Sequence, residues 1–437
     1  MAACSNLSSS NRAHRLLYNR KEAKDKKGDE KMKRAGIYIM VVLIFLVFLV
    51  PSISKANVDS IVEANNKFAF DLYLNLSKET KTENIFFSPF SISTALAMTY
   101  EGARGKTAEE MEKVLYFPKD NQTRRNGFLE LITEINKENK KYQLHTANAL
   151  WVEKTYNLLK EYLEIIDRYY KGKATKVGFI NPYEREQSRL MINKWVEDKT
   201  NGKIKDLIKP NMLSGGASLV LTNAIYFKGN WQVKFDKSAT KEEDFNITPK
   251  EKIKVQMMRI TGKNPPKFNY AETEDLQVLE MPYEGDELSM LILLPKKSIN
   301  DVEETITYQK IKELKGKLEK VPVEVYIPKF KFESGVILNE LLENMGMSTA
   351  FIDLLADFSG INGYKDLYID KAIHKAFIDV NEEGTEAAAA TAIIMGRKSL
   401  SFTKPVIFRA DRPFMFIIQH NKTGAILFIG RVYKPSY

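Results

Sequence analysis

The sequence predicts an α+β protein with large, mostly antiparallel β-sheets. Apolar residues recur at helical spacing in much of the first third, whereas later parts hold runs rich in branched and aromatic residues. Helices followed by many strands are typical of the α+β class. No linker rich in Pro, Gly and Ser and no internal repeat interrupts residues 57–437, so we expect one domain over this range.

Most of the predicted helices lie before residue 200. Apolar spacing over residues 58–77 predicts the first. Ser88 and Pro89 are typical of an N-cap and a first helical position, and they predict a helix that runs to about Tyr100. Thr107-Ala108-Glu109-Glu110 has the order of a capping box and predicts the start of another helix. Further helical patterns cover residues 188–199 and 300–318.

The predicted strands dominate the remainder. Residues 321–332 alternate, with Val323 and Val325 facing one way and Glu324 and Tyr326 the other. Apolar and branched runs predict further strands at residues 142–152, 218–227, 277–282, 288–294 and 373–380. A final pair of strands, joined by a turn at residues 420–423, is expected over residues 407–418 and 424–432.

The first 56 residues have the composition of an export signal. They carry a net charge of +7, which leaves only +3 on the rest of the chain and gives no reason to expect a nucleic-acid partner. Basic residues precede fourteen apolar residues, Ile37 to Val50, and Ser54-Lys55-Ala56 offers a signal-peptidase site. We therefore expect a secreted protein with no membrane contact after cleavage. An uncleaved anchor is the alternative, and Met32 is a second candidate start.

Motifs for enzymatic or metal chemistry are missing from the sequence. The only cysteine is Cys4, in the leader, and no G-x-S-x-G, H-E-x-x-H or paired-cysteine pattern is present. Residues 102–107 resemble the end of a phosphate-binding loop, but Tyr100 stands where the first glycine is required. The sequence thus predicts a protein that is not an enzyme and needs no metal or cofactor.

Residues 382–399 form an unusual segment between two predicted strands. Gly384 precedes a run of small side chains, and Arg397, Lys398 and Ser399 follow it. If this segment became a strand, alternate residues from Thr385 to Met395 would face the core, and none of them carries a charge. Taken alone, the run also fits an alanine-rich helix or an irregular loop.

Five colinear segments make the chain resemble the serpins, a family of serine protease inhibitors. They are residues 84–92, 102–107, 221–231, 408–414 and 424–431. The resemblance implies three sheets, eight or nine helices and an exposed reactive-centre loop at about residues 382–404. It also implies that a protease attacks the loop, forms an acyl-enzyme and is trapped when the loop inserts into sheet A. A non-inhibitory serpin that acts as a binding or chaperone-like protein is the alternative.

The family's spacing of seventeen residues, counted from Glu382, places the cleaved bond at Lys398-Ser399. Arg397 is a competing site one residue earlier. A lysine at this position suits a trypsin-like protease, whose pocket ends in a carboxylate, and we expect the inhibitor to be a monomer. The residues of the implied hinge are Glu382, Gly384, Thr385, Glu386, Ala387, Ala388, Ala389 and Ala390.

Further sites follow from the same resemblance. Ser91, Asn223 and His374 match the polar shutter that holds sheet A closed, and Trp231 matches the breach tryptophan. A heparin-type cofactor is a weaker hypothesis, because glutamates are interspersed among the basic residues that suggest it. Those basic residues are Arg124, Arg125, Lys137, Lys140 and Lys141.

Overall fold

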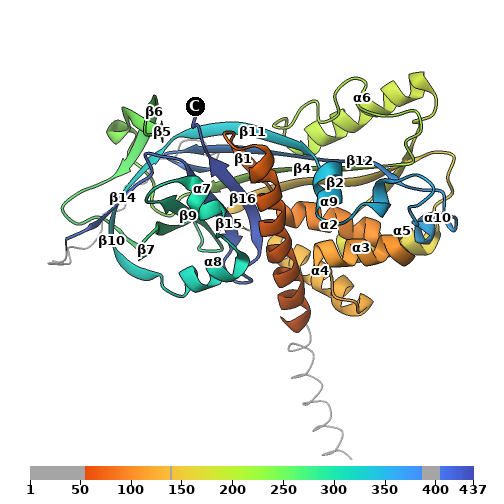
Figure 1. Ribbon diagram of the computed structural model, residues 1–437, viewed down its shortest axis with the longest axis horizontal. Coiled ribbons are helices and arrows are strands. Elements are labelled where there is room, and N and C mark those ends of the chain that lie inside the picture. Colours follow the sequence, from red (N-terminus) through yellow and green to blue (C-terminus); the bar gives the residue numbers. More distant parts are fainter. Residues whose placement is uncertain (1–54, 138–139, 386–403) are drawn as a thin grey trace, which may run out of the picture. The chain divides into compact units, whose positions relative to one another are not determined.

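Two β-sheets with helices on their faces organise the chain (Figure 1). The computed structural model describes residues 55–137, 140–385 and 404–437, and Asn57–Tyr437 forms one compact unit. Helices come first and strands dominate later, so the predicted α+β class is confirmed. The predicted leader lies outside the described residues, apart from residues 55 and 56.

The described residues contain ten α-helices, of which α7, α9 and α10 are the shortest, whereas the resemblance implied eight or nine. None of the described helices is both long enough and apolar enough to cross a bilayer. The helices are residues 55–79, α2 (Pro89–Tyr100), α3 (Gly105–Leu115), α4 (Asn121–Ile135), α5 (Lys160–Tyr170), α6 (Pro182–Lys199), α7 (Ile299–Glu303), α8 (Tyr308–Lys315), α9 (Asn339–Asn344) and α10 (Ser359–Asn362).

Sixteen strands are described, and all but a few are paired antiparallel. The strands are β1 (Ile85–Phe87), β2 (Tyr142–Glu153), β3 (Ala174–Val177), β4 (Leu219–Asn230), β5 (Lys241–Thr248), β6 (Glu251–Ile260), β7 (Lys267–Glu272), β8 (Leu276–Pro282), β9 (Leu288–Pro295), β10 (Glu319–Pro328), β11 (Phe330–Ile337), β12 (Ile369–Asn381), β13 (Gly384–Thr385), β14 (Val406–Arg409), β15 (Phe414–His420) and β16 (Ile426–Val432).

The six-stranded sheet has the order β11-β12-β13-β4-β2-β3. Along most of their length β12 and β4 pair directly and in parallel, from Ile369 with Leu219 to Phe377 with Tyr226. Figure 1 shows α6 on one face and α2 to α5 on the other. Each face has its own apolar core, the smaller one beneath α6. Because both faces are covered, β4 is almost continuously buried, and most of its first nine residues are apolar.

A single long strand, β10, links the other strands into one ten-stranded sheet. Its first half pairs with β7, and its second half pairs with β6 and with β14. The three sheets expected from the sequence are therefore present as two hydrogen-bonded sets. This long strand ends at Pro328, and the predicted strand over residues 321–332 is in fact the end of β10 and the start of β11.

The capping box predicted at Thr107 is wrong. Helix α3 begins two residues earlier, at Gly105, and its N-cap Arg104 makes no side-chain capping bond. The Thr107 hydroxyl is buried and instead accepts a hydrogen bond from the Asp357 backbone N–H at 2.9 Å. The Ser88 cap, in contrast, is confirmed, because its side chain accepts the Ser91 N–H at the start of α2.

Candidate functional site

The first residues of the 382–399 segment lie inside the six-stranded sheet. Gly384 and Thr385 form β13, which pairs antiparallel with the end of β12 on one side and with Gly229 and Asn230 of β4 on the other. Strands β12 and β4 pair directly with each other as far as Phe377 and Tyr226, and β13 lies between them beyond those residues. Two residues of the segment thus already occupy the position that an additional strand would take.

Gly384 is required at this position by both backbone conformation and space. Its φ of +155° is rarely adopted by residues with a side chain, and an added Cβ would lie 2.1 Å from the Gly229 carbonyl oxygen. Thr385, the next residue, is fully buried and shares a 2.8 Å hydrogen bond with the Tyr283 hydroxyl. A bulky or charged residue at either position would displace β13 from the sheet.

The Trp231 indole packs beside β13, and Trp231 binds the backbone of the residues that precede β13. Its ring stacks on Tyr283 with centroids 4.6 Å apart, and its Nε1 donates to the Asn381 carbonyl at 3.0 Å. Its backbone N–H donates to the Glu383 carbonyl at 2.8 Å. This arrangement places the predicted breach tryptophan against both the last residue of β12 and the start of β13.

Two glutamates hold the turn between β12 and β13 through lysines. Glu382 accepts hydrogen bonds from Thr240 at 2.8 Å and pairs with Lys329 at 3.1 Å. Glu383 pairs with Lys234 at 2.8 Å and with Lys237 at 3.1 Å. Burial acts to raise the pKa of Glu382, but its backbone, Thr240 and Lys329 bonds outweigh burial and lower that pKa. Both carboxylates are therefore charged at neutral pH.

The three residues predicted to form the polar shutter meet at the junction of β4 and β12. Asn223 donates from its Nδ2 to the Ser91 hydroxyl at 2.6 Å, and its Oδ1 contacts His374 Nδ1. The other imidazole nitrogen, Nε2, accepts the Ser88 backbone N–H at 3.2 Å. His374 is therefore neutral with its proton on Nδ1, and burial lowers its pKa to about 3. A strand inserted between β4 and β12 would separate His374 from Asn223.

Asn148 of β2 belongs to the same hydrogen-bond network as the predicted shutter residues, and the sequence alone did not indicate it. Its Oδ1 accepts from Asn223 Nδ2 at 2.5 Å and from the Ser91 hydroxyl at 2.8 Å. In register, Asn148 lies opposite Asn223, which in turn lies opposite His374. The signal in the sequence was a lone asparagine within the apolar run of residues 147–152.

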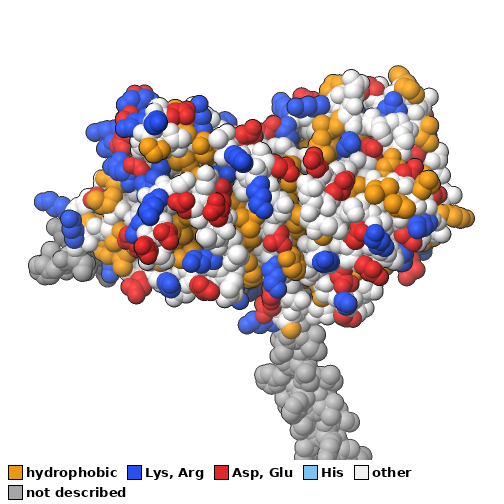
Figure 2. Space-filling model, viewed as in Figure 1, with side chains coloured by type: hydrophobic (Ala, Val, Ile, Leu, Met, Phe, Trp, Pro, Cys, Tyr) orange, Lys and Arg blue, Asp and Glu red, His pale blue; other side chains and the backbone are white. Residues whose placement is uncertain are grey.

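The basic residues suggested for a heparin-type cofactor all face carboxylates. Arg124 is buried against Glu101, and Arg125 binds the same carboxylate at 2.7 Å. The three lysines pair with different glutamates. Their partners are Glu134 for Lys137, Glu287 for Lys140 and Glu284 for Lys141. Figure 2 shows acidic and basic side chains intermixed over the visible face. This arrangement argues against a heparin-type site here.

The remaining predicted site residues lie outside the described part of the chain. They are Glu386, Ala387, Ala388, Ala389, Ala390, Arg397, Lys398 and Ser399. Among the residues that the structure does describe, no cluster of His, Cys, Asp and Glu could hold a metal ion. The described residues thus form a six-stranded sheet in which β4 and β12 separate at one end, with β13 of the same chain between them.

Comparisons with known proteins define the family. A family model described as serpin (serine protease inhibitor) matches residues 63–435. The chain is 46% identical over 380 residues to an uncharacterized serpin-like protein of Thermococcus kodakarensis, covering 86% of each chain. It is 42% identical over 388 residues to the leukocyte elastase inhibitor of Homo sapiens, covering 86% of this chain and all of that one. A crystal structure of uncleaved ovalbumin superposes with a TM-score of 0.77 at 32% identity, covering 86% of this chain and 100% of that one. The chain belongs to the serpin family, and the six-stranded sheet is sheet A of that family.

We expect His374→Ala to destabilise sheet A by about 2–4 kcal/mol. The substitution removes two buried hydrogen bonds, leaves Asn223 Oδ1 without its donor and opens a cavity. Thermal unfolding and polymerisation on mild heating measure the effect. His420→Ala is the matched control, because His420 is also buried but bonds Thr423, away from this junction. If His374→Ala changes neither property, the shutter role is wrong.

The same imidazole predicts a pH dependence of stability. Its folded-state pKa of about 3 lies below its unfolded value near 6.5, so acid protonates the unfolded chain first. The stabilising contribution is complete above about pH 6.5 and is lost progressively as the pH falls toward 3. Between pH 6.5 and pH 5 we expect about 2 kcal/mol of loss. Urea unfolding should show a smaller loss for His374→Gln; an equal loss would assign the dependence to other groups.

Proposed function

We propose that the chain is an exported suicide-substrate inhibitor of trypsin-like serine proteases, cleaved at the Lys398-Ser399 bond. The observation that carries this proposal is the position of Gly384 and Thr385 between β4 and β12. At alternate positions the residues that follow are uncharged as far as Met395, and they are small as far as Thr391, as an inserted strand requires. The segment is thus suited to continue the strand that β13 begins.

The proposed trap begins as ordinary proteolysis. The protease serine Oγ attacks the Lys398 carbonyl carbon, the amide bond to Ser399 breaks, and the Ser399 amine leaves with a proton. An ester then joins the protease to Lys398. Insertion of residues 386–398 as the strand between β4 and β12 carries the protease with it before water attacks the ester. Sheet A gains a full set of ladder hydrogen bonds, and this gain drives the step.

The residue before the cleaved bond sets the class of target. Lysine at 398 suits a specificity pocket that ends in a carboxylate, and Arg397 offers the same chemistry one residue earlier. The human relative is named for its inhibition of leukocyte elastase. We assign a different target class to this chain because its proposed bond follows a long basic side chain.

Mixing the protein with trypsin should produce a covalent complex that survives SDS and a C-terminal fragment that begins at Ser399. Mass spectrometry of that fragment fixes the bond, and Lys398→Ala should reduce complex formation by at least about 100-fold. The variant retains Arg397, so any residual complex should form by cleavage after Arg397 and should yield a fragment that begins at position 398. Cleavage by several basic-specific proteases without any complex would contradict the inhibitory mechanism and favour the binding-protein alternative.

Export rests on the leader sequence alone. A mature chain that begins at Asn57 is the expected form in the medium, and N-terminal sequencing of the native protein checks it. Retention in the membrane fraction with the leader intact would contradict cleavage and support an anchored protein.

A further inference from the structure

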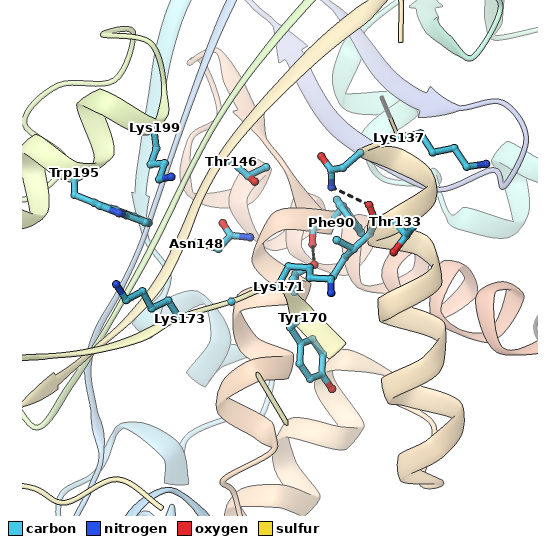
Figure 3. Close-up of a pocket in the computed structure, with 14 residues that line it drawn as sticks. Phe90, Thr133, Lys137, Thr146, Asn148, Tyr170, Lys171, Lys173, Trp195 and Lys199 are labelled. Atoms are coloured by element: carbon cyan, nitrogen blue, oxygen red, sulfur yellow. Dashed lines mark hydrogen bonds between the residues drawn. The ribbon is translucent and has the colours of Figure 1, made fainter. Parts of the chain in front are cut away.

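A cavity of about 530 Å³ lies where four separate segments of the chain meet, beside the start of α7. The segments are the end of β5 with the turn after it, the link from β9 into α7, the link from β14 to β15, and the residue that follows β16. Pro249, Lys297 and Asn300 are exposed, so the cavity opens at the surface. The larger cavity shown in Figure 3 lies beside β2 and shares no lining residue with this one. We call the smaller space the α7 cavity.

The lining of the α7 cavity is partly apolar. Ile247, Ile299 and Pro413 are buried and line it, and the half-buried Tyr433 adds an aromatic ring. Ligand pockets of about 300–1,000 Å³ typically combine such a lining with a few polar groups that fix the orientation of the ligand. The α7 cavity is therefore large enough and apolar enough for a small aromatic molecule.

The charged side chains that line the α7 cavity are both basic. They are Lys297 and Arg412, and no Asp or Glu lines it among the described residues. Two of the five donors of Arg412 are used to hold it: Nε donates to the Pro295 carbonyl at 2.6 Å, and Nη1 donates to the Asp411 carboxylate at 2.8 Å. Lys297 forms no ion pair within the part of the chain that the structure describes. An anion in the cavity would meet one ammonium group and the remaining donors of one guanidinium.

Two hydroxyl groups add further donors to this lining. Thr248 Oγ1 accepts the backbone N–H groups of Lys250 at 3.3 Å and Glu251 at 3.0 Å, and Ser298 Oγ accepts the backbone N–H of Asn300 at 3.2 Å. A hydroxyl oxygen that accepts in this way keeps its hydrogen for another partner. The cavity thus offers more donors than the two oxygens of a carboxylate require. A phosphate ester, with three strong acceptor oxygens, matches this lining better.

We propose that the α7 cavity binds a small phosphomonoester that carries an aromatic body. The phosphate would accept hydrogen bonds from Lys297, Arg412 and the two hydroxyl groups, and the aromatic body would pack against Tyr433 and the two isoleucines. A neutral molecule of the same shape would lack the first set of contacts, and inorganic phosphate would lack the second. No residue of the α7 cavity belongs to the hinge or the shutter, so this site is independent of the proposed function.

Binding can be measured by equilibrium dialysis of the full chain against 1-naphthyl phosphate, with naphthyl fluorescence as the readout. We expect saturable binding at one site in about 0.15 M salt, where weak surface attraction is largely screened. 1-Naphthol and inorganic phosphate should each bind at least about tenfold more weakly. Lys297→Gln should weaken binding of 1-naphthyl phosphate at least about fivefold, and Tyr433→Ala should do the same by removing the ring.

Lys296→Gln is the matched control. Lys296 is the adjacent exposed lysine, but it pairs with Glu272 at 2.7 Å and does not line the cavity. This variant should bind 1-naphthyl phosphate as the original chain does. No saturable binding would overturn the proposed site, and so would an equal loss in the Lys296 and Lys297 variants. Equal binding of 1-naphthol would overturn the selectivity for a phosphate.

Thermal unfolding provides a second readout of the same site. The four segments that line the cavity are far apart in the sequence and come together only in the folded chain, so a ligand bound among them stabilises the folded state. Saturating 1-naphthyl phosphate should raise Tm by about 1–3 °C in the original chain and in Lys296→Gln, and by less at the same concentration in Lys297→Gln. Saturable binding without any rise in Tm would mean that the probe does not bind in the folded cavity, and would overturn the proposal.

Discussion

Replacing Thr385 by arginine should turn the proposed inhibitor into a substrate. Thr385 is fully buried between β12 and β4, with its hydroxyl against Tyr283. An arginine cannot occupy this position without burying a charge, which costs several kcal/mol. The hinge would leave the sheet, insertion would slow, and water would reach the acyl-enzyme first. We expect the inhibition rate to fall by at least about 100-fold and most of the chain to be recovered cleaved.

Thr385→Ser is the control, because it keeps a hydroxyl of similar size for Tyr283, and it should retain most of the inhibition. Stopped titrations against trypsin, followed by densitometry of complex and cleaved bands, measure both variants. Undiminished complex formation by Thr385→Arg would mean that the segment does not insert at this position. If the chain inhibits nothing but binds another molecule, that binding should not change with either substitution.

Local sequence signals predicted that helices α2 and α3 exist, but they did not predict both starting residues equally well. The Ser88-Pro89 start of α2 is confirmed because a cap and its helix are decided within four residues. Thr107 has an equally good local signal, yet its hydroxyl bonds Asp357, which is 250 residues away. A pattern of neighbouring residues cannot predict a contact between residues that are so far apart in the sequence.

The same distinction applies to the candidate site. Family resemblance identified Ser91, Asn223 and His374, but their bonding depends on the register of β4 with β12, which the sequence alone does not provide. Asn148 was missed because a single polar residue in an apolar strand is not specific. The position of Gly384 and Thr385 between β4 and β12 was not predicted, because it depends on how far these two strands separate at their ends.

Replacing Arg431 by methionine should produce the largest loss of stability of any substitution considered. The Arg431 side chain is fully buried and donates to both oxygens of Glu303, at 2.9 and 3.0 Å, and to the Glu83 carbonyl at 2.9 Å. Tyr73 donates to the same carboxylate at 2.5 Å. Removing the guanidinium leaves Glu303 as an uncompensated buried charge, which costs about 3–5 kcal/mol. Urea unfolding of the full chain measures this change.

Lys194→Met is the control for an exposed pair, since Lys194 lies 2.7 Å from Asp198 with both side chains largely in water, and it should change stability by no more than about 1 kcal/mol. Adding Glu303→Leu to Arg431→Met should recover part of the loss, because the unpaired charge is then gone. None of the Arg431 partners belongs to β13, so folded Arg431→Met should still trap trypsin with the original stoichiometry. A lost trap in the folded variant would show that this cluster, and not only the hinge and shutter, controls strand insertion.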